Sequence, residues 1–290
     1  MTTLPSSNPI HKEVCKVSQQ CKRHTSPLHH LATTFPIHPK STEEIRTPCH
    51  SPKWIPEIEI IIDGNKEDTV KHANEAKEEV QIFTDRSGYN GGIGATVVLR
   101  RLGRRDKILC FHLGSKKEHT VYNGEQVGMI LGAELLWREG DVHSVYMGVN
   151  NQAAIQATLS HDSHSRHSLT DMFMQVLQKA MECHNIENFK ICWVPGHVNV
   201  VGNEAVDIEA KKVAEGDMSP TSTLPAVLKR GRNLICLPHN KVALIQANNE
   251  RLKQYITNDF TSSAHGERIH QIDPILPSGK YAALVNSLPQ

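Results

Sequence analysis

Residues 80–113 read VQIFTDRSGYNGGIGATVVLRRLGRRDKILCFHL. Three apolar runs lie in this stretch; glycines separate the first run from the second, and Leu102-Gly103 separates the second from the third. Short apolar runs bounded by such residues are typical of strands joined by tight turns. The stretch therefore predicts three consecutive antiparallel strands, at 80–85, 93–100 and 107–113.

Helices and strands alternate after this stretch. A helix is predicted from Asn123 to about Glu139, because Asn123 and Gln126 have the spacing of a capping box and apolar residues recur on one helical face. Further strands are predicted at 142–149 and 189–194, and further helices at 151–159, 168–183 and 201–214. This order predicts an α/β fold with a five-stranded mixed sheet, three antiparallel strands and then parallel ones, flanked by helices.

The regions outside residues 77–217 show weaker patterns. Residues 1–55 are rich in Pro, Ser, Thr, His and Lys without an apolar period, so we expect a disordered tail. A short apolar run at 58–62 and a weak helix at 66–79 lead into the expected domain at 77–217. Residues 218–290 are expected to be a linker and a partly helical extension, with one helix at about 241–256.

The composition limits the class of protein. A net charge of +1 identifies no partner by itself, since a nucleic-acid binder can gather its basic residues on one face. The seven cysteines are scattered without a Cys-x-x-Cys pair, which argues against a disulfide framework or a zinc ribbon and favours a reducing, intracellular compartment. No run of 18 apolar residues is present, so we expect no membrane span. Nucleus and cytoplasm both stay open.

Three acidic residues hold places where their side chains can meet. Asp85 ends the first predicted strand, Glu125 lies in the first turn of the first long helix, and Asp207 lies on the last helix, ten residues after His197. Carboxylates at a strand end and on facing helices can gather around Mg²⁺, which prefers oxygen ligands. Two such ions about 3.5 to 4 Å apart promote phosphodiester hydrolysis. The alternative is that each acid is a solvated surface charge.

Five motifs occur in order along the expected domain. They are FTDRSG at 83–88, GIGA at 92–95, TVYNGEQVG at 120–128, NQAAI at 151–155 and WVPGHVNVVGNEAVD at 193–207. With these motifs the chain resembles the type 1 ribonuclease H domain found in the polyproteins of fungal LINE-type (non-LTR) retrotransposons. Residues 228–290 resemble the segment that follows this domain in those polyproteins.

The resemblance implies a ribonuclease H-like fold and an endonuclease that hydrolyses the RNA strand of an RNA/DNA hybrid with Mg²⁺ or Mn²⁺. Its catalytic and metal-binding positions correspond to Asp85, Glu125, Asn150 and Asp207, and His197 would assist product release or proton transfer. The family has Asp at position 150, whereas Asn offers one neutral carbonyl oxygen, so we expect catalysis to fall severely. Arg86 also stands where the family has a Gly, which tolerates a positive φ.

Candidate substrate contacts surround the expected site. Asn123, Asn151 and Gln152 are candidates for binding the 2′-OH groups of the RNA strand, although Asn123 is as well explained as a helix cap. A basic hairpin of Arg100, Arg101, Arg104, Arg105 and Lys107 can touch phosphates or can be a solvated face.

The expected partners are an RNA/DNA hybrid and, in the parent element, a reverse transcriptase. We expect a monomer that does not bind membranes. Three hypotheses stay open: an active or weakened ribonuclease, a catalytically dead module that binds hybrids, and a decayed remnant of a retroelement.

Overall fold

The computed structural model describes residues 41–43, 58–62, 64–159, 167–196, 206, 209–210, 212–263, 266–268 and 271. Within these residues the main sheet has six strands in the order β1-β6-β5-β2-β3-β4. The strands are β1 (Ile58–Ile61), β2 (Val80–Tyr89), β3 (Gly92–Arg101), β4 (Lys107–Ser115), β5 (Ser144–Val149) and β6 (Asn188–Trp193). Neighbours from β2 to β4 are antiparallel, and the pairs β2–β5, β5–β6 and β6–β1 are parallel.

The predicted α/β fold with a mixed sheet flanked by helices is confirmed, but the predicted number of strands was wrong. The sixth strand is β1, which pairs in parallel with β6 from Ile58↔Phe189 to Ile61↔Cys192. The sequence shows a short apolar run at 58–62, but no strand was predicted there. A run of that length does not reveal which strand it will pair with.

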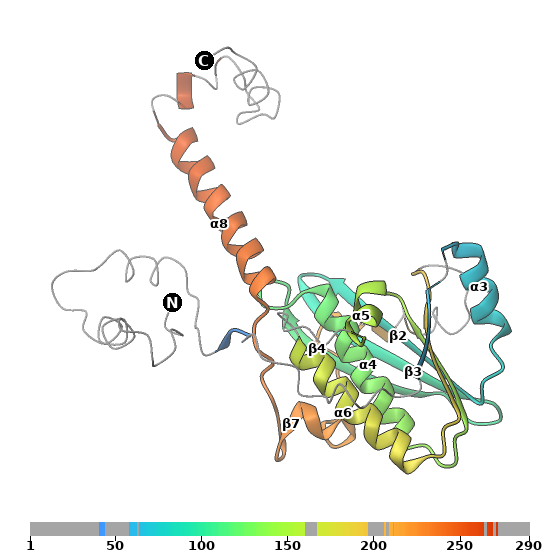
Figure 1. Cartoon of the computed structure of the whole chain (residues 1–290). Coiled ribbons are helices and arrows are strands. Elements are labelled where there is room, and N and C mark those ends of the chain that lie inside the picture. The colour runs from blue at the N-terminus through green and yellow to red at the C-terminus, as the bar shows by residue number, and fades with distance from the viewer. Residues whose placement is uncertain are drawn as a thin grey trace, which may run out of the picture. The chain divides into compact units, whose positions relative to one another are not determined.

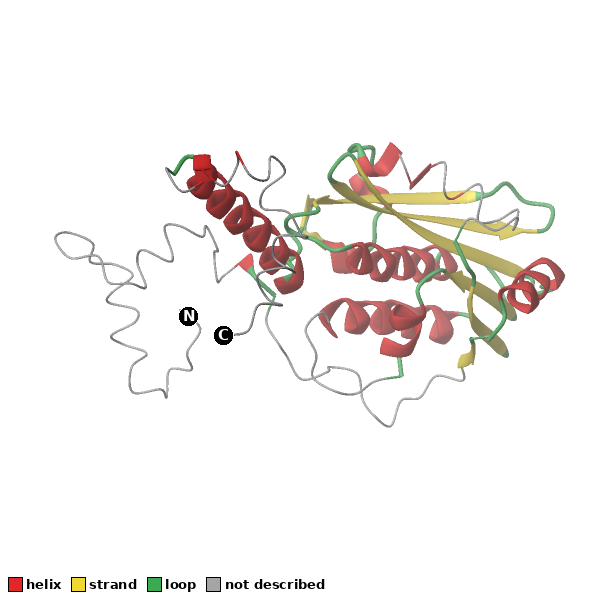
Figure 2. Cartoon of the chain, turned by 90° about the horizontal axis from the view of Figure 1, so that it is seen from above, coloured by secondary structure: helices red, strands yellow, loops and turns green. Residues whose placement is uncertain are grey.

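Two long helices form a layer on one face of the sheet (Figures 1 and 2). They are α4 (Val121–Trp137) and α6 (His167–Cys183), and their apolar side chains join those of the sheet in the main hydrophobic core. The short helix α5 (Gln152–Ala157) follows β5. Gln126 of α4 donates a hydrogen bond of 2.8 Å to the hydroxyl of Thr170 of α6. This buried bond fixes the two long helices to each other.

Glycines bring α4 close to β2. Gly124, Gly128 and Gly132 are spaced by four residues and share one face of the helix. A Cβ added at Gly132 would lie 3.0 Å from a methyl carbon of Ile82, and one added at Gly124 would lie 3.1 Å from the Cβ of Arg86. Side chains at these positions would push the helix away. The glycines therefore allow Glu125, beside Gly124, to lie against the strand.

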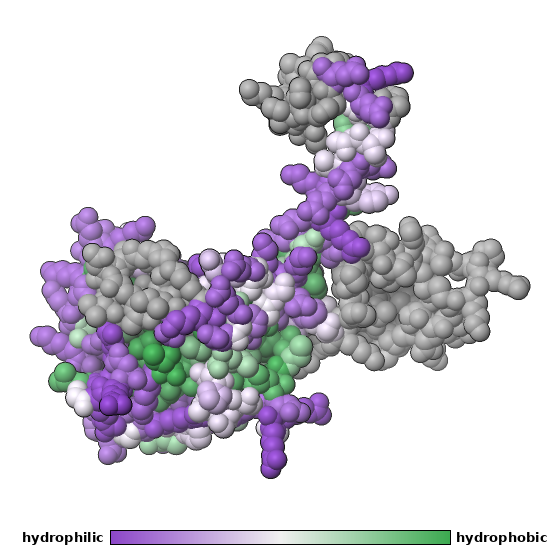
Figure 3. Space-filling view, turned by 180° about the vertical axis from the view of Figure 1, so that it is seen from behind, coloured by the Kyte–Doolittle hydropathy of each residue, from purple (hydrophilic) through white to green (hydrophobic). Residues whose placement is uncertain are grey.

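The opposite face of the sheet carries a smaller core. Helix α3 (Lys66–Glu75) contributes Ala73, and the helical residue Val206 packs into the same cluster as Phe83 of β2. Residues 206, 209–210 and 212–214 belong to the predicted last helix and are helical. Figure 3 shows the molecule from behind, where hydrophobic side chains (green) reach the surface between hydrophilic ones (purple).

Several element bounds differ from the sequence prediction, among them those of β2 and α4. Strand β2 continues past Asp85 to Tyr89, because residues 86–89 still pair with β3 up to a tight turn at Asn90 and Gly91. Both turn residues have positive φ, 48° and 81°, as two-residue hairpin turns require. Helix α4 begins at Val121 rather than Asn123, because Thr120 is its N-cap.

Part of the segment expected to be a linker packs into the main core. Leu224, Leu228 and Leu237 are buried there, and Ser219 accepts a hydrogen bond of 2.9 Å from the backbone N–H of Cys110. The first compact unit of the chain accordingly runs to Leu244. The bounds 77–217 stay a prediction, and the expected tail at 1–55 lies outside the described residues except for 41–43.

The second compact unit is Ile245–Gln290 and contains most of α8 (Lys241–Thr261), the helix expected at about 241–256. In the part of the chain that the structure describes, neither α8 nor any other helix combines the length and apolar character needed to cross a membrane.

Candidate active site

Asp85 and Asn150 meet where two central strands separate. The parallel pairing of β2 with β5 ends at Thr84↔Val149, so Asp85 and Asn150 are the next residues on each side. The side-chain amide of Asn150 donates a hydrogen bond of 2.5 Å to Oδ1 of Asp85. Asp85 is 8% exposed, so little of this residue is in contact with solvent.

Glu125 lies on α4 beside these two residues and is fully buried. Nε of Arg86 donates a hydrogen bond of 3.0 Å to its Oε1. Burial raises the pKa of Glu125 to about 8, and the charge of Asp85 acts in the same direction. The charge and hydrogen bond of Arg86 oppose this rise without cancelling it. Additional positive charge near Glu125 would therefore lower its pKa and stabilise its ionised form.

Trp193 holds the backbone of Asn150. Its indole N–H donates a hydrogen bond of 3.2 Å to the carbonyl oxygen of Asn150, across the pairing of β6 with β5. The sequence placed Trp193 in the motif at 193–207 but gave it no role at the site. The pairing of β6 with β5 explains this contact: Trp193 ends β6 opposite Val149, the residue before Asn150.

Two buried oxygens at the site have no hydrogen-bond partner among the described residues, Oε2 of Glu125 and Oδ1 of Asn150. Together with the Asp85 carboxylate they form an oxygen set of the type that Mg²⁺ or Mn²⁺ prefers. The residues therefore fit a divalent ion, with one negative charge fewer than three carboxylates would supply. No group of three or more His, Cys, Asp or Glu side chains suited to a metal occurs in the described ranges.

The predicted site residues Asp207 and His197 lie outside the described residues. Their described neighbour Val206 is fully buried, in the small core that includes Phe83, two residues before Asp85. The structure thus brings together Asp85, Glu125 and Asn150 of the predicted set.

Comparisons with known proteins give likenesses to solved structures only. No family model and no curated protein matches the chain. A ribonuclease H1 from the halophilic archaeon Halobacterium salinarum NRC-1 is 15% identical, with a TM-score of 0.36, over 46% of this chain and 97% of that one. LC11-RNase H1, solved in complex with an RNA/DNA hybrid, is 16% identical, with a TM-score of 0.37, over 47% of this chain and 96% of that one. What bears on function is the chemistry of the site itself.

Two of the three candidate substrate contacts, Asn123 and Asn151, form hydrogen bonds at the starts of helices. Asn123 is 4% exposed, and its Oδ1 accepts hydrogen bonds from the backbone N–H and the hydroxyl of Thr120, at 3.0 and 2.8 Å. Asn151 caps α5 by accepting a hydrogen bond of 3.1 Å from the N–H of Ala154. Gln152 begins α5 and is half-buried. Asn123 is therefore not the N-cap of α4 but the residue that completes the capping box with Thr120. The three substrate contacts stay predictions.

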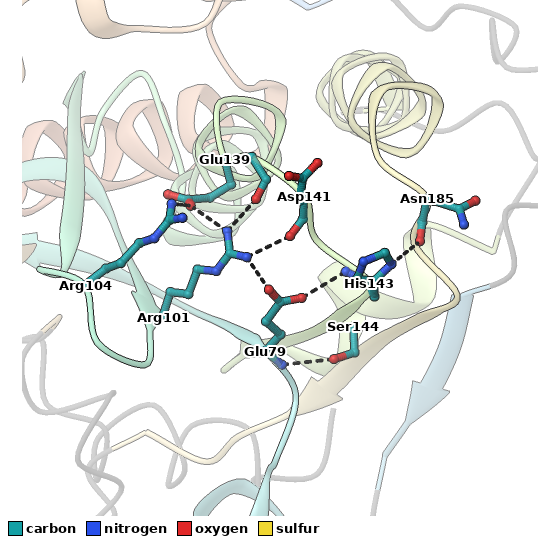
Figure 4. A network of polar contacts seen from close by, with 9 residues as sticks. Glu79, Arg101, Arg104, Glu139, Asp141, His143, Ser144 and Asn185 are labelled. Atoms are coloured by element: carbon teal, nitrogen blue, oxygen red, sulfur yellow. Dashed lines mark hydrogen bonds and ion pairs between the residues drawn. The ribbon is translucent and has the colours of Figure 1, made fainter.

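The basic hairpin is largely neutralised by acids of the same domain (Figure 4). Glu139, whose side chain is only 1% exposed, forms ion pairs with Arg101, Arg104 and Lys107. Arg100 pairs with Asp106. These four cations stabilise the hairpin and its contact with the end of α4. The hairpin is accordingly a poor candidate for a phosphate-binding patch.

Arg86 has extended backbone within β2, paired with Ala95 of β3. Its φ is not positive, so the backbone here does not need a glycine. The consequence of Arg86 for the site is its charge, which the sequence comparison with the family had treated only as a question of backbone conformation.

Proposed function

We propose that the region of about residues 77–217 is a ribonuclease H-type domain that holds an RNA/DNA hybrid and hydrolyses its RNA strand slowly. The observation that carries the proposal is the meeting of Asp85 on β2, Glu125 on α4 and Asn150 after β5, two of which carry a buried oxygen without a hydrogen-bond partner among the described residues. Asp85 and Glu125 lie in motifs that resemble ribonuclease H, and Asn150 directly precedes the motif at 151–155. The origin in a LINE-type element and the reverse transcriptase partner stay predictions from those motifs.

The side chains divide the work of the site in this proposal. Asp85, Glu125 and Asn150 would hold Mg²⁺ or Mn²⁺ through oxygen, with Asp207 as the fourth position that the resemblance implies. The bound ion would supply positive charge to the attacking and leaving oxygens of the phosphodiester. Trp193 fixes the backbone of Asn150. Asn150 itself contributes no charge, and its amide occupies an oxygen of Asp85, so the affinity for the ion and the rate of cleavage are both low.

The test is the substitution Asn150→Asp. It adds a carboxylate beside Asp85 and removes the amide that binds Oδ1. We expect the cleavage rate of a labelled RNA/DNA hybrid in Mg²⁺ or Mn²⁺ to rise at least about a hundredfold, because a metal site gains a charged ligand.

Two variants control this experiment. Asp85→Asn in the Asn150→Asp background is expected to abolish the gain, since it removes the other carboxylate. Asn185→Asp adds the same charge at an exposed turn after α6 and is expected to leave the rate unchanged. Equal rates for the wild-type chain and Asn150→Asp would contradict the assignment of position 150 as a metal ligand.

A second candidate function is the binding of hybrids without turnover. It is favoured by the pairing of both described carboxylates, Asp85 with Asn150 and Glu125 with Arg86. Fluorescence anisotropy with an RNA/DNA hybrid and with duplex DNA of the same sequence measures this binding. We expect tighter binding of the hybrid, whose 2′-OH groups offer extra contacts across a shallow minor groove. Equal affinities would contradict hybrid recognition, and cleavage by the wild-type chain would exclude a pure binding module.

A further inference from the structure

Arg86 places a fixed positive charge inside the candidate site. The residue follows Asp85 on β2, and its Cβ lies beside Gly124 of α4. From there Nε reaches Oε1 of Glu125 at 3.0 Å. The Glu125 side chain is fully buried, whereas 39% of the Arg86 side chain is exposed. The guanidinium therefore joins a buried carboxylate to the surface of the site.

A buried carboxylate needs a compensating cation, because removal of its charge from water is costly. Among the described residues, Arg86 forms an ion pair with Glu125. A divalent ion would compensate the same carboxylate, and its two charges would be repelled by the guanidinium beside it. Asn150, which also lies at the site, is neutral and cannot offset that repulsion. Arg86 and a divalent ion thus compete for one acid.

We propose that Arg86 stands in for a divalent ion at Glu125 and so sets the metal affinity of this site at a low level. The inference rests on the proposed metal site and assigns to Arg86 a positioning role through Glu125, distinct from the effect of Asn150. It extends the proposed function by naming a second residue that limits it. The competing reading is a structural ion pair that joins β2 to α4 without effect on metal binding.

The test measures Mn²⁺ binding to the metal-free chain by isothermal titration calorimetry, without nucleic acid. Arg86→Gln removes the charge and keeps a polar side chain. We expect its Mn²⁺ affinity to rise at least about tenfold over the wild-type chain, since a unit charge close to a divalent ion is removed. Arg86→Lys keeps the charge and is expected to bind Mn²⁺ as the wild-type chain does.

The matched control is Arg100→Gln on β3. It removes the same charge from a residue that pairs with Asp106, outside the site. We expect no change in Mn²⁺ affinity. The proposal would be overturned if Mn²⁺ affinity rose equally in Arg100→Gln and Arg86→Gln, or rose in neither. A gain in Arg86→Lys as large as that in Arg86→Gln would also overturn it.

Melting curves add a second readout. Arg86→Gln leaves Glu125 buried without its partner, so we expect a lower melting temperature without metal and a larger increase on addition of Mn²⁺ than in the wild-type chain. Adding Glu125→Gln to Arg86→Gln is expected to remove that increase. An increase that persists in the double variant overturns the proposal, and so does an Arg86→Gln chain that is unfolded with and without Mn²⁺.

The result is independent of cleavage. A gain in Mn²⁺ affinity in Arg86→Gln together with an inactive Asn150→Asp chain would support the role of Arg86 and reject the proposed ribonuclease activity. The reverse pair of results would reject the role of Arg86 alone.

Discussion

At the scale of single residues, the position of Asn150 depends on the indole of Trp193. The Trp193→Phe variant keeps the ring and removes the donor to the Asn150 carbonyl. We expect the free energy of unfolding in urea to fall by about 1 kcal/mol, the net value of one hydrogen bond. Trp137→Phe is the matched control, because Trp137 is 41% exposed and its indole N–H donates to the weak acceptor Sγ of Cys183. An equal loss in both variants would contradict a specific role for Trp193.

The sequence predicted Asp85, Glu125 and Asn150 of the candidate site but not their partners. Asp85 and Glu125 lie in recognisable motifs and Asn150 directly precedes one, so their meeting could be expected from the order of strands and helices. The ion pair of Arg86 with Glu125 depends on the distance between β2 and α4. That distance is set by Gly124 and by packing, which no local pattern reports.

At the scale of elements, one arginine joins three segments at the other end of the central strands (Figure 4). Arg101, at the end of β3, pairs with Glu79 just before β2 and with Glu139 after α4. It also donates to the carbonyl oxygens of Gly140 and Asp141, at 2.5 and 2.7 Å. The hairpin sequence showed the basic residues, but the two acids that pair with Arg101 lie more than 20 residues away from it. We call Arg101 with Glu79 and Glu139 the clamp. The local charge pattern of the hairpin could not predict these ion pairs.

The clamp predicts a dependence of stability on pH. The backbone N–H of His143 lowers the pKa of Glu79 below its ordinary value of 4.5, and Arg101 lowers it further against the effect of burial. A lowered pKa in the folded state means that the charged form of Glu79 stabilises the fold above pH 4.5. That stabilisation is lost as the pH falls below 4.5 through the folded-state pKa.

Urea unfolding of the wild-type chain and Glu79→Gln at pH 7 and below pH 4.5 measures this effect. We expect the wild-type chain to be the more stable at pH 7 and the difference to shrink in acid. Glu67→Gln, in an exposed turn of α3, should show no such change. A difference between the wild-type chain and Glu79→Gln that is constant with pH would refute the assignment.

At the scale of the whole molecule, the sequence predicted the mixed sheet but not how far the core extends. The β-β-β-α-β-α-α-β-α order was enough, because right-handed crossovers and short hairpins leave few ways to build a sheet from it. Two additions escaped this reasoning, strand β1 and the segment from Leu224 to Leu237. Leu224 follows a Pro- and Ser/Thr-rich stretch, and Leu228 and Leu237 stand at the ends of the stretch LKRGRNLICL, with no period of a helix or strand. Their burial depends on a surface that only the folded domain provides.

The extent of the core is testable at Leu228. Its side chain is fully buried in the main cluster, so Leu228→Ala leaves a cavity and is expected to lower the free energy of unfolding by about 2 to 4 kcal/mol. A leucine in a mere linker would contribute almost nothing. Leu252→Ala on α8 is the matched control, because that leucine is 44% exposed, and we expect a loss below about 1 kcal/mol. Equal small losses of unfolding free energy in Leu228→Ala and Leu252→Ala would show that the segment after residue 217 does not belong to the domain. A larger loss in Leu228→Ala than in Leu252→Ala would mean that a chain ending at 217 lacks part of its own core.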